Sequence, residues 1–162
     1  MSEASQVEVR RGLEGCLTRL WRYAGMLSKD PDVAEDLVQA TCVRAIERAD
    51  QYTPGTRLDR WLFVILRSIW LNEVRARRIR LGVVELEGAL IIDGESELET
   101  NILAAEVLTA LNQLPEGQRE TVLLVYGEGY SYAEAANLLG IPIGTVMSRL
   151  ASARSALTRL LE

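Results

Sequence analysis

Residues 131–161 of the chain are SYAEAANLLGIPIGTVMSRLASARSALTRLL, and this stretch decides the fold of everything around it. Ser131 and Glu134 form the S-x-x-E pattern of a capping box ahead of an apolar run, which predicts the start of a helix. Gly140 tolerates the left-handed conformation that ends a helix, and Pro142 two residues later cannot continue one. The stretch therefore predicts a short helix that stops at a glycine turn.

A second, longer helix is expected after this turn, with Thr145 as its cap. Its apolar side chains recur at helical spacing at Val146, Leu150, Ala153 and Leu157. A short helix, a glycine turn and a longer helix are typical of the helix-turn-helix motif, although the spacing also fits an ordinary helical hairpin. Residues 144–161 contain three arginines and no acidic residue, which favours DNA as the partner of the second helix.

Charge is distributed unevenly along the 162 residues. Residues 1–80 hold 14 basic and 11 acidic side chains, whereas residues 81–100 hold six acidic side chains and no basic one. The net charge of −5 therefore conceals basic segments. Together with the helical patterns, this composition predicts an all-α chain of two small domains, at 1–80 and 100–162, joined by an acidic linker at 81–99.

The residue types present exclude several classes of function. Histidine is absent, which removes histidine-dependent catalysis and the commonest zinc ligand. Cys16 and Cys42 stand alone, so we expect buried reduced thiols and no metal site. We expect no enzyme activity and no cofactor, because no nucleophile–base or metal constellation occurs. The first residues are charged rather than apolar, so we expect neither a signal peptide nor a membrane span, and a cytoplasmic location.

A helix is expected over residues 7–27, and a second is expected to start at Asp30-Pro31. The buried side of the second helix is predicted to consist of Val33, Leu37, Ala40, Val43 or Ala45, and Ile46. Its first turns carry an acidic cluster, formed by Asp32, Glu35 and Asp36. Two interpretations remain open: the acids stabilise the helix start through its dipole, or they form a docking face for a partner.

A third helix is expected over residues 57–80, after a turn at 51–56 that contains Pro54-Gly55. Its middle, WLFVILRSIWL, is apolar almost all round. The helix is therefore either central in a bundle or turns some of its rings to a partner such as unpaired bases, which stack on aromatic rings for ~1–3 kcal/mol each. Residues 60–80 carry a net charge of +5, which fits a phosphate-binding stripe or solvated cations at a helix C-terminus.

Three stretches of the chain resemble the characteristic regions of the extracytoplasmic-function (ECF) sigma factors of bacterial RNA polymerase. They are DPDVAEDLVQATCVRAIERADQY, TRLDRWLFVILRSIWLNEVRARR and LNQLPEGQRETVLLVYGEGYSYAEAANLLGIPIGTVMSRLASAR. Their order and spacing match over roughly residues 10–80 and 105–160. The resemblance implies a promoter-specificity subunit that binds core RNA polymerase and promoter DNA and catalyses nothing itself.

The resemblance also implies roles for residues already described. The face of this chain that docks on the β′ clamp helices of the polymerase would comprise Asp32, Glu35, Asp36 and Gln39. Residues that melt the minus-ten element and capture its bases would include the turn 51–56 and Trp61, Arg67, Ser68, Arg75, Arg77 and Arg78. Residues that contact the minus-thirty-five duplex would be Thr145, Ser148, Arg149, Ser152 and Arg154. The family further implies a contact with the polymerase β flap, a linker that threads the active-site cleft, and an anti-sigma factor as inhibitor.

The chain departs from the family pattern at three positions. Ser68 stands where the family commonly has asparagine in the pocket for a flipped base, and Met147 and Ser152 stand where basic residues are usual or frequent. The shorter side chain of Ser68 leaves the minus-ten preference open, and the departures at Met147 and Ser152 predict weak or unusual promoter binding. Two other functions stay open at this point: a helix-turn-helix regulator that acts without core polymerase, and a sigma mimic that binds an anti-sigma factor. The DNA-facing arginines argue against a mimic.

Overall fold

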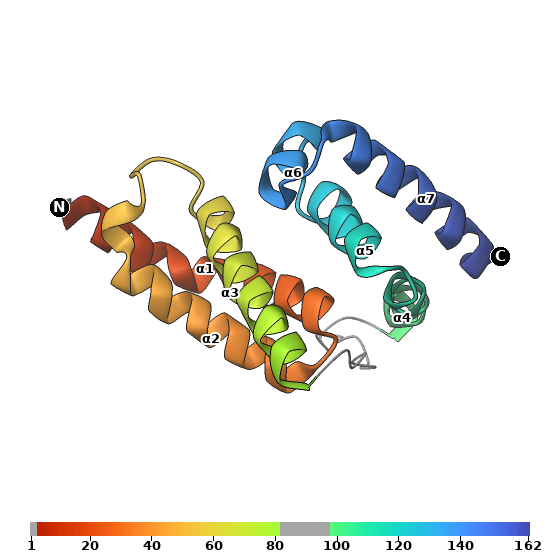
Figure 1. Cartoon of the computed structure of the whole chain (residues 1–162), viewed down its shortest axis with the longest axis horizontal. Helices are drawn as coiled ribbons and strands as arrows, with labels where there is room; N and C mark the ends of the chain where they lie inside the picture. Colours follow the sequence, from red (N-terminus) through yellow and green to blue (C-terminus); the bar gives the residue numbers. More distant parts are fainter. Residues whose placement is uncertain (1–2, 82–97) are drawn as a thin grey trace. The chain divides into compact units, whose positions relative to one another are not determined.

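The computed structural model describes residues 3–81 and 98–162, which form helices joined by short connections and contain no strand (Figure 1). The chain divides into two compact units, Met1–Gly88 and Ala89–Glu162. The all-α prediction is therefore confirmed. Most of the predicted linker 81–99 lies outside the described residues, so the predicted domain boundaries and linker stay predictions.

The first unit is a bundle of three long helices, α1 (Glu3–Ser28), α2 (Pro31–Glu47) and α3 (Leu58–Leu81), with a short 3₁₀ turn η1 (Ala49–Gln51) after α2. All three helices pack against one another (Figure 1). Tyr23 of α1 and Phe63 of α3 are buried in the core with their ring centroids 4.8 Å apart. Burial accounts for most of the apolar middle of α3, because this helix packs on both of the others, but Val64 and Leu71 are exposed.

The start of α2 is as predicted. The Asp30 carboxylate accepts hydrogen bonds from the backbone N–H groups of Asp32 (2.9 Å) and Val33 (3.3 Å), which satisfies donors that an uncapped helix leaves free. Its buried side differs in part from the prediction, since it consists of Ala34, Leu37, Val38, Thr41 and Ala45. Thr41 can be buried because its hydroxyl donates to the Leu37 carbonyl at 2.7 Å. Val33 is only half-buried, and the exposed residues of the predicted set are Ala40, Val43 and Ile46.

The second unit consists of α4 (Leu98–Asn112), α5 (Glu116–Val122), a π-helical turn η2 (Leu123–Gly127), α6 (Tyr132–Leu139) and α7 (Ile143–Leu161). Helices α4, α5 and α6 all contact α7, whose buried side chains are Val146, Leu150 and Ala153. Arg119 of α5 is buried and donates from Nη1 to the Leu114 carbonyl at 3.0 Å. Burial lowers the pKa of Arg119, and this effect outweighs the negative charges of Glu116 and Glu120, which raise it.

The turn between α6 and α7 confirms the helix-turn-helix prediction. The Ser131 hydroxyl accepts from the Glu134 N–H at 3.0 Å, and the Glu134 carboxylate accepts from the Ser131 N–H at 2.9 Å. Gly140 is left-handed with φ +66°. The prediction that Thr145 caps α7 is wrong, because Pro142 precedes the first turn and the Thr145 N–H already bonds the Pro142 carbonyl at 2.9 Å. Pro142 sets the entry into α7 with a fixed φ and no N–H to satisfy.

Candidate functional site

The predicted docking residues lie on one exposed face of α2. Asp32, Glu35, Asp36 and Gln39 are all exposed, and at 3.6 residues per turn they fall within about 100° of the helix circumference. The Gln39 amide donates to the Glu35 carboxylate at 3.4 Å. The other side of α2 packs on α1 and α3. The structure therefore places the four residues together as an anionic patch on the outside of the bundle.

The same face of α2 continues with two apolar side chains: Ile46, which was predicted to be buried, and Val43, which was predicted as an alternative to Ala45. Val43 is 56% exposed and Ile46 is 43% exposed, both one or two turns after Gln39. Helical periodicity could not have identified them as surface residues, because α2 carries apolar residues on two faces and periodicity does not say which face is covered. The exposed face of α2 is therefore acidic in its first half and apolar in its second.

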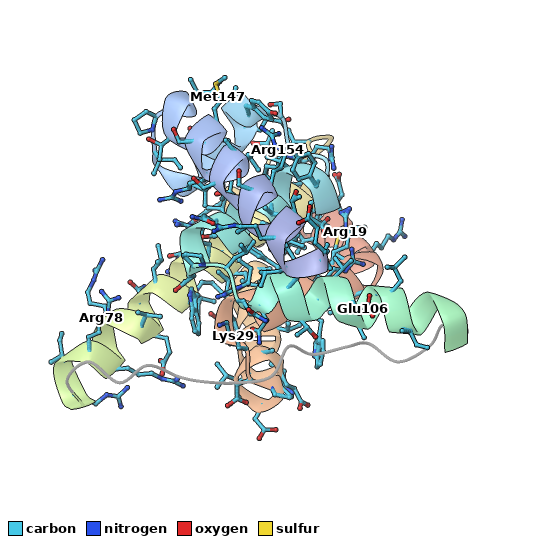
Figure 2. The ribbon with its side chains drawn as sticks, turned by 90° about the vertical axis from the view of Figure 1, so that its right-hand side faces the viewer. Arg19, Lys29, Arg78, Glu106, Met147 and Arg154 are labelled. Atoms are coloured by element: carbon cyan, nitrogen blue, oxygen red, sulfur yellow. The ribbon has the colours of Figure 1, made fainter. Side chains whose placement is uncertain are left out.

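Four of the six predicted minus-ten residues of α3 fall on a stripe along the exposed side of that helix. Trp61 is half-exposed, and Ser68, Arg75 and Arg78 are exposed. These four side chains occupy about 100° of the circumference. Figure 2 shows Arg78 near the end of α3, where its side chain points away from the bundle. Val64 and Leu71, which are 54% and 39% exposed, lie on the same stripe and were not predicted.

Arg67 and Arg77 are arranged differently from the other predicted minus-ten residues. Arg67 is half-buried at the border of the stripe. Arg77 lies on the opposite side of α3 from Trp61 by helical geometry, and its Nε contacts the Glu73 carboxylate at 3.1 Å. The structure thus joins Trp61, Ser68, Arg75 and Arg78, with Arg67 beside them, and separates Arg77 from the set.

The loop before α3 is attached to α1 by Glu8. Tyr52 is almost completely buried, and its hydroxyl lies 2.9 Å from Oε1 of Glu8 and 2.7 Å from the Thr56 carbonyl oxygen. The Gly55 N–H points to both Glu8 carboxylate oxygens, at 3.2 and 3.3 Å. Burial, and then the hydrogen bond to Glu8, raise the pKa of Tyr52. No sequence signal connects Glu8 with a turn more than forty residues away.

The outward face of α7 is nearly uncharged over its first three turns. Ser148 and Ser152 are exposed there beside Met147, which is 52% exposed and projects from the beginning of the helix (Figure 2). Thr145 is half-buried at the edge of this face. The first half of the helix therefore offers two hydroxyl groups and no cation at the centre of this face, with the Met147 thioether towards the flank that carries Arg154.

The two predicted arginines lie on opposite flanks of α7. The Arg149 guanidinium packs on the first turn of α5, since a Cβ added at Gly117 would lie 3.0 Å from its Cζ. Arg154 is exposed and donates to the Tyr126 hydroxyl at 2.8 Å. This hydrogen bond, with a second that Arg154 donates to Tyr132, raises the pKa of Arg154. Both cations are held at the borders of the serine-lined face.

The described residues contain no cluster of acids and cysteines that could hold a metal ion. Cys16 and Cys42 were expected to be buried reduced thiols; both are free cysteines but only half-buried, and this partial burial raises the pKa of each thiol. In the part of the chain that the structure covers, no helix is long and apolar enough to cross a membrane.

Comparison with known proteins identifies the family. The family model for sigma-70 region 2 matches residues 13–79, and the model for sigma-70 region 4 matches residues 104–157. The chain is 35% identical over 153 residues to the ECF RNA polymerase sigma factor EcfG of Rhodopseudomonas palustris (strain TIE-1), covering 94% of this chain and 84% of the relative. This chain belongs to the ECF sigma factors. It is an alternative sigma factor and not an enzyme, as the resemblance implied.

Two solved structures resemble this chain over nearly its whole length. The sigma factor RpoE from Bartonella quintana, in complex with the anti-sigma factor NepR, matches with a TM-score of 0.79 and 35% identity over 94% of this chain and 95% of that one. CnrH, in complex with the cytosolic domain of CnrY, matches with a TM-score of 0.61 and 25% identity over 98% of this chain and 97% of that one. In this sigma factor, region 2 thus comprises the α1–α3 bundle, and region 4 contains the helix-turn-helix.

Proposed function

We propose that this ECF sigma factor attaches to the polymerase β′ clamp helices through the exposed face of α2. The proposal rests on the anionic patch formed by Asp32, Glu35, Asp36 and Gln39, which lies on the outside of the bundle. Val43 and Ile46 extend the same face with apolar surface, so docking would combine charge attraction with burial of two aliphatic side chains. Region 4 would make the second polymerase contact, on the β flap.

The α3 stripe is the surface that we assign to the melted minus-ten element. Trp61 offers a ring for base stacking, and Arg75 and Arg78 offer cations for the phosphates of the displaced strand. The loop 51–56 lies at the beginning of the same helix and would capture an exposed base. Ser68, which replaces the usual asparagine of the family, is exposed on the stripe and is expected to change the base preference there.

The outward face of α7 is the surface that we assign to the major groove at the minus-thirty-five element. Ser148 and Ser152 would reach base edges, while Thr145, Arg149 and Arg154 at the borders would contact the phosphate backbone. Because Arg149 and Arg154 flank the face, we expect both to set affinity and register more than base choice.

An anti-sigma factor is the expected inhibitor of this protein, and the cytoplasm is its expected location. The similar solved structure of RpoE from Bartonella quintana is a sigma factor in complex with the anti-sigma factor NepR. Such an inhibitor would have to cover the polymerase-facing or DNA-facing surfaces described above. Co-expression of each neighbouring gene product with this chain tests the proposal, since one of them should suppress transcription from its promoters.

The observation that carries the proposed function is the anionic patch on α2, and charge reversal tests it. We expect Asp36→Arg to weaken binding to core polymerase by at least about tenfold, because it places a cation within an acidic docking surface. Glu14→Arg, at an exposed acid on α1, is the matched control and should bind as the wild type does. Equal core affinity of the two variants in a fluorescence titration would show that α2 is not the docking face.

A further inference from the structure

The loop between η1 and α3 is held from two sides by side chains of α1. Glu8 accepts hydrogen bonds from Tyr52 and Gly55 inside the loop, and Arg19 pairs with Asp59 at 2.7 Å just after it. Gly12, between these two residues on α1, lies so close to Leu58 that a Cβ would contact its side chain. Helix α1 therefore fixes the loop near its beginning and at its end.

The contacts of Glu8 separate a rigid base of the loop from an open tip. Tyr52 is 2% exposed, and its ring centroid lies 5.3 Å from that of Trp61. Within the turn, the Thr56 N–H and hydroxyl both donate to the Thr53 carbonyl, at 3.3 and 2.6 Å. Residues 53–56 are nevertheless exposed, and Gly55 is left-handed with φ +81°. The loop is thus preformed while its tip remains accessible.

We propose that Glu8 is a positioning residue for minus-ten recognition, which holds the loop 52–56 and the Trp61 ring in the conformation that receives an unpaired base. This inference rests on the proposed role of the α3 surface. Glu8 itself faces the inside of the loop, and it need not contact DNA. A loop fixed before DNA binds loses less conformational entropy on capturing a base, and it presents one geometry to competing bases.

Two variants separate the carboxylate contacts from a general charge effect. Glu8→Ala removes the acceptors for both the Tyr52 hydroxyl and the Gly55 N–H, whereas Glu8→Gln keeps one acceptor oxygen for them. Glu14→Ala is the control, because it removes an exposed acid from the same helix and changes the net charge equally. Tyr52→Phe removes only the hydroxyl, so Glu8→Ala should cost less in that background than in the wild type.

The test is run-off transcription by the complete holoenzyme from a promoter mapped on genomic DNA, with each minus-ten base varied in turn. We expect Glu8→Ala to lower transcription on the order of three- to tenfold, the range expected for a lost hydrogen bond, and to reduce discrimination between minus-ten bases. Glu8→Gln should recover part of the transcription and part of the base discrimination. The affinity of both Glu8 variants for core polymerase should match that of Glu14→Ala.

Two outcomes would overturn the inference, and they are distinguishable. If Glu8→Ala and Tyr52→Phe both transcribe and discriminate like Glu14→Ala, Glu8 does not position the loop, although the proposed minus-ten surface stands. If the wild-type holoenzyme itself ignores every minus-ten substitution, the proposed surface is wrong and the inference fails with it. Should Glu8→Ala fail to fold, Glu8→Gln and Tyr52→Phe give the same comparison.

Discussion

Asp59 shows how one side chain can join two helices of the bundle. Its carboxylate contacts Nη2 of Arg19 on α1 at 2.7 Å and Nη2 of Arg57 before α3 at 2.7 Å. Burial alone would raise the pKa of Asp59, but the Arg57 hydrogen bond and the charges of Arg19 and Arg57 outweigh it, so the pKa is lowered. The ionised carboxylate is therefore favoured by folding.

We expect Asp59→Asn to destabilise the first unit by about 1–2 kcal/mol at pH 7, because it removes the charge that pairs with both arginines. A carboxyl whose pKa is lowered by folding stabilises the protein above its unfolded pKa, and that stability is lost as pH falls through the folded pKa. The difference in the free energy of unfolding between wild type and Asp59→Asn should thus shrink below about pH 4. Tryptophan fluorescence during urea unfolding measures it, since Trp21, Trp61 and Trp70 all belong to this unit. A difference independent of pH would contradict this account.

Met147 tests whether the outward face of α7 approaches DNA. It is 52% exposed beside Ser148 and Ser152, at a position where the family usually has a basic residue. We expect Met147→Arg to tighten binding to a selected minus-thirty-five duplex several-fold and to steepen the salt slope by about one unit, as one added phosphate contact would. Gln6→Arg, an equal charge change at an exposed position in the other unit, should do neither. If both variants behaved alike, α7 would not be the DNA-facing helix.

At the scale of elements, the helix boundaries were largely predictable because local chemistry sets them. Asp30 with Pro31 and Ser131 with Glu134 each supply a cap within a few residues, and the structure confirms both. The cap at Thr145 was predicted wrongly, because Pro142 competes for the same role at an earlier position. Local sequence signals therefore predict a helix start reliably when only one residue near it can act as the cap.

The buried faces were predicted less well than the boundaries. Ala40 and Ile46 of α2 were expected inside and are exposed. Spacing shows which side chains share a face, but a helix with two apolar faces needs the tertiary structure to decide which is covered. The same limit hid Val43 and Ile46 from the candidate docking face, and the link between Glu8 and its loop depends on the packing of α1 against the rest of the bundle.

The capping box of α6 should be a measurable part of the stability of the helix-turn-helix. We expect Ser131→Ala to destabilise the second unit by about 1 kcal/mol, because the Glu134 N–H loses its acceptor. Ser131→Asp should retain most of the stability, since aspartate is an equally good cap. Circular dichroism during denaturation should detect the loss while tryptophan fluorescence stays unchanged. Wild-type stability of the alanine variant would show that the box contributes nothing.

For the molecule as a whole, the division into two compact units matches the two tasks of promoter recognition. Region 2 carries the proposed docking face of α2 and the proposed minus-ten stripe of α3, and region 4 carries α7. The α3 stripe and the α7 face are assigned to two different elements of one promoter and the α2 face to the polymerase, so we expect specificity to require both units on the same polymerase. A regulator acting without polymerase would have no use for the face of α2.

The most direct measurement is run-off transcription on genomic fragments by purified core polymerase, with and without this chain. We predict discrete transcripts that require the chain and that disappear when either the mapped minus-ten or the mapped minus-thirty-five element is replaced. Asp36→Arg should abolish these transcripts at subsaturating core concentration. Absence of any chain-dependent transcript, combined with tight binding of the isolated chain to duplex DNA, would contradict the account and favour a regulator that acts without core polymerase.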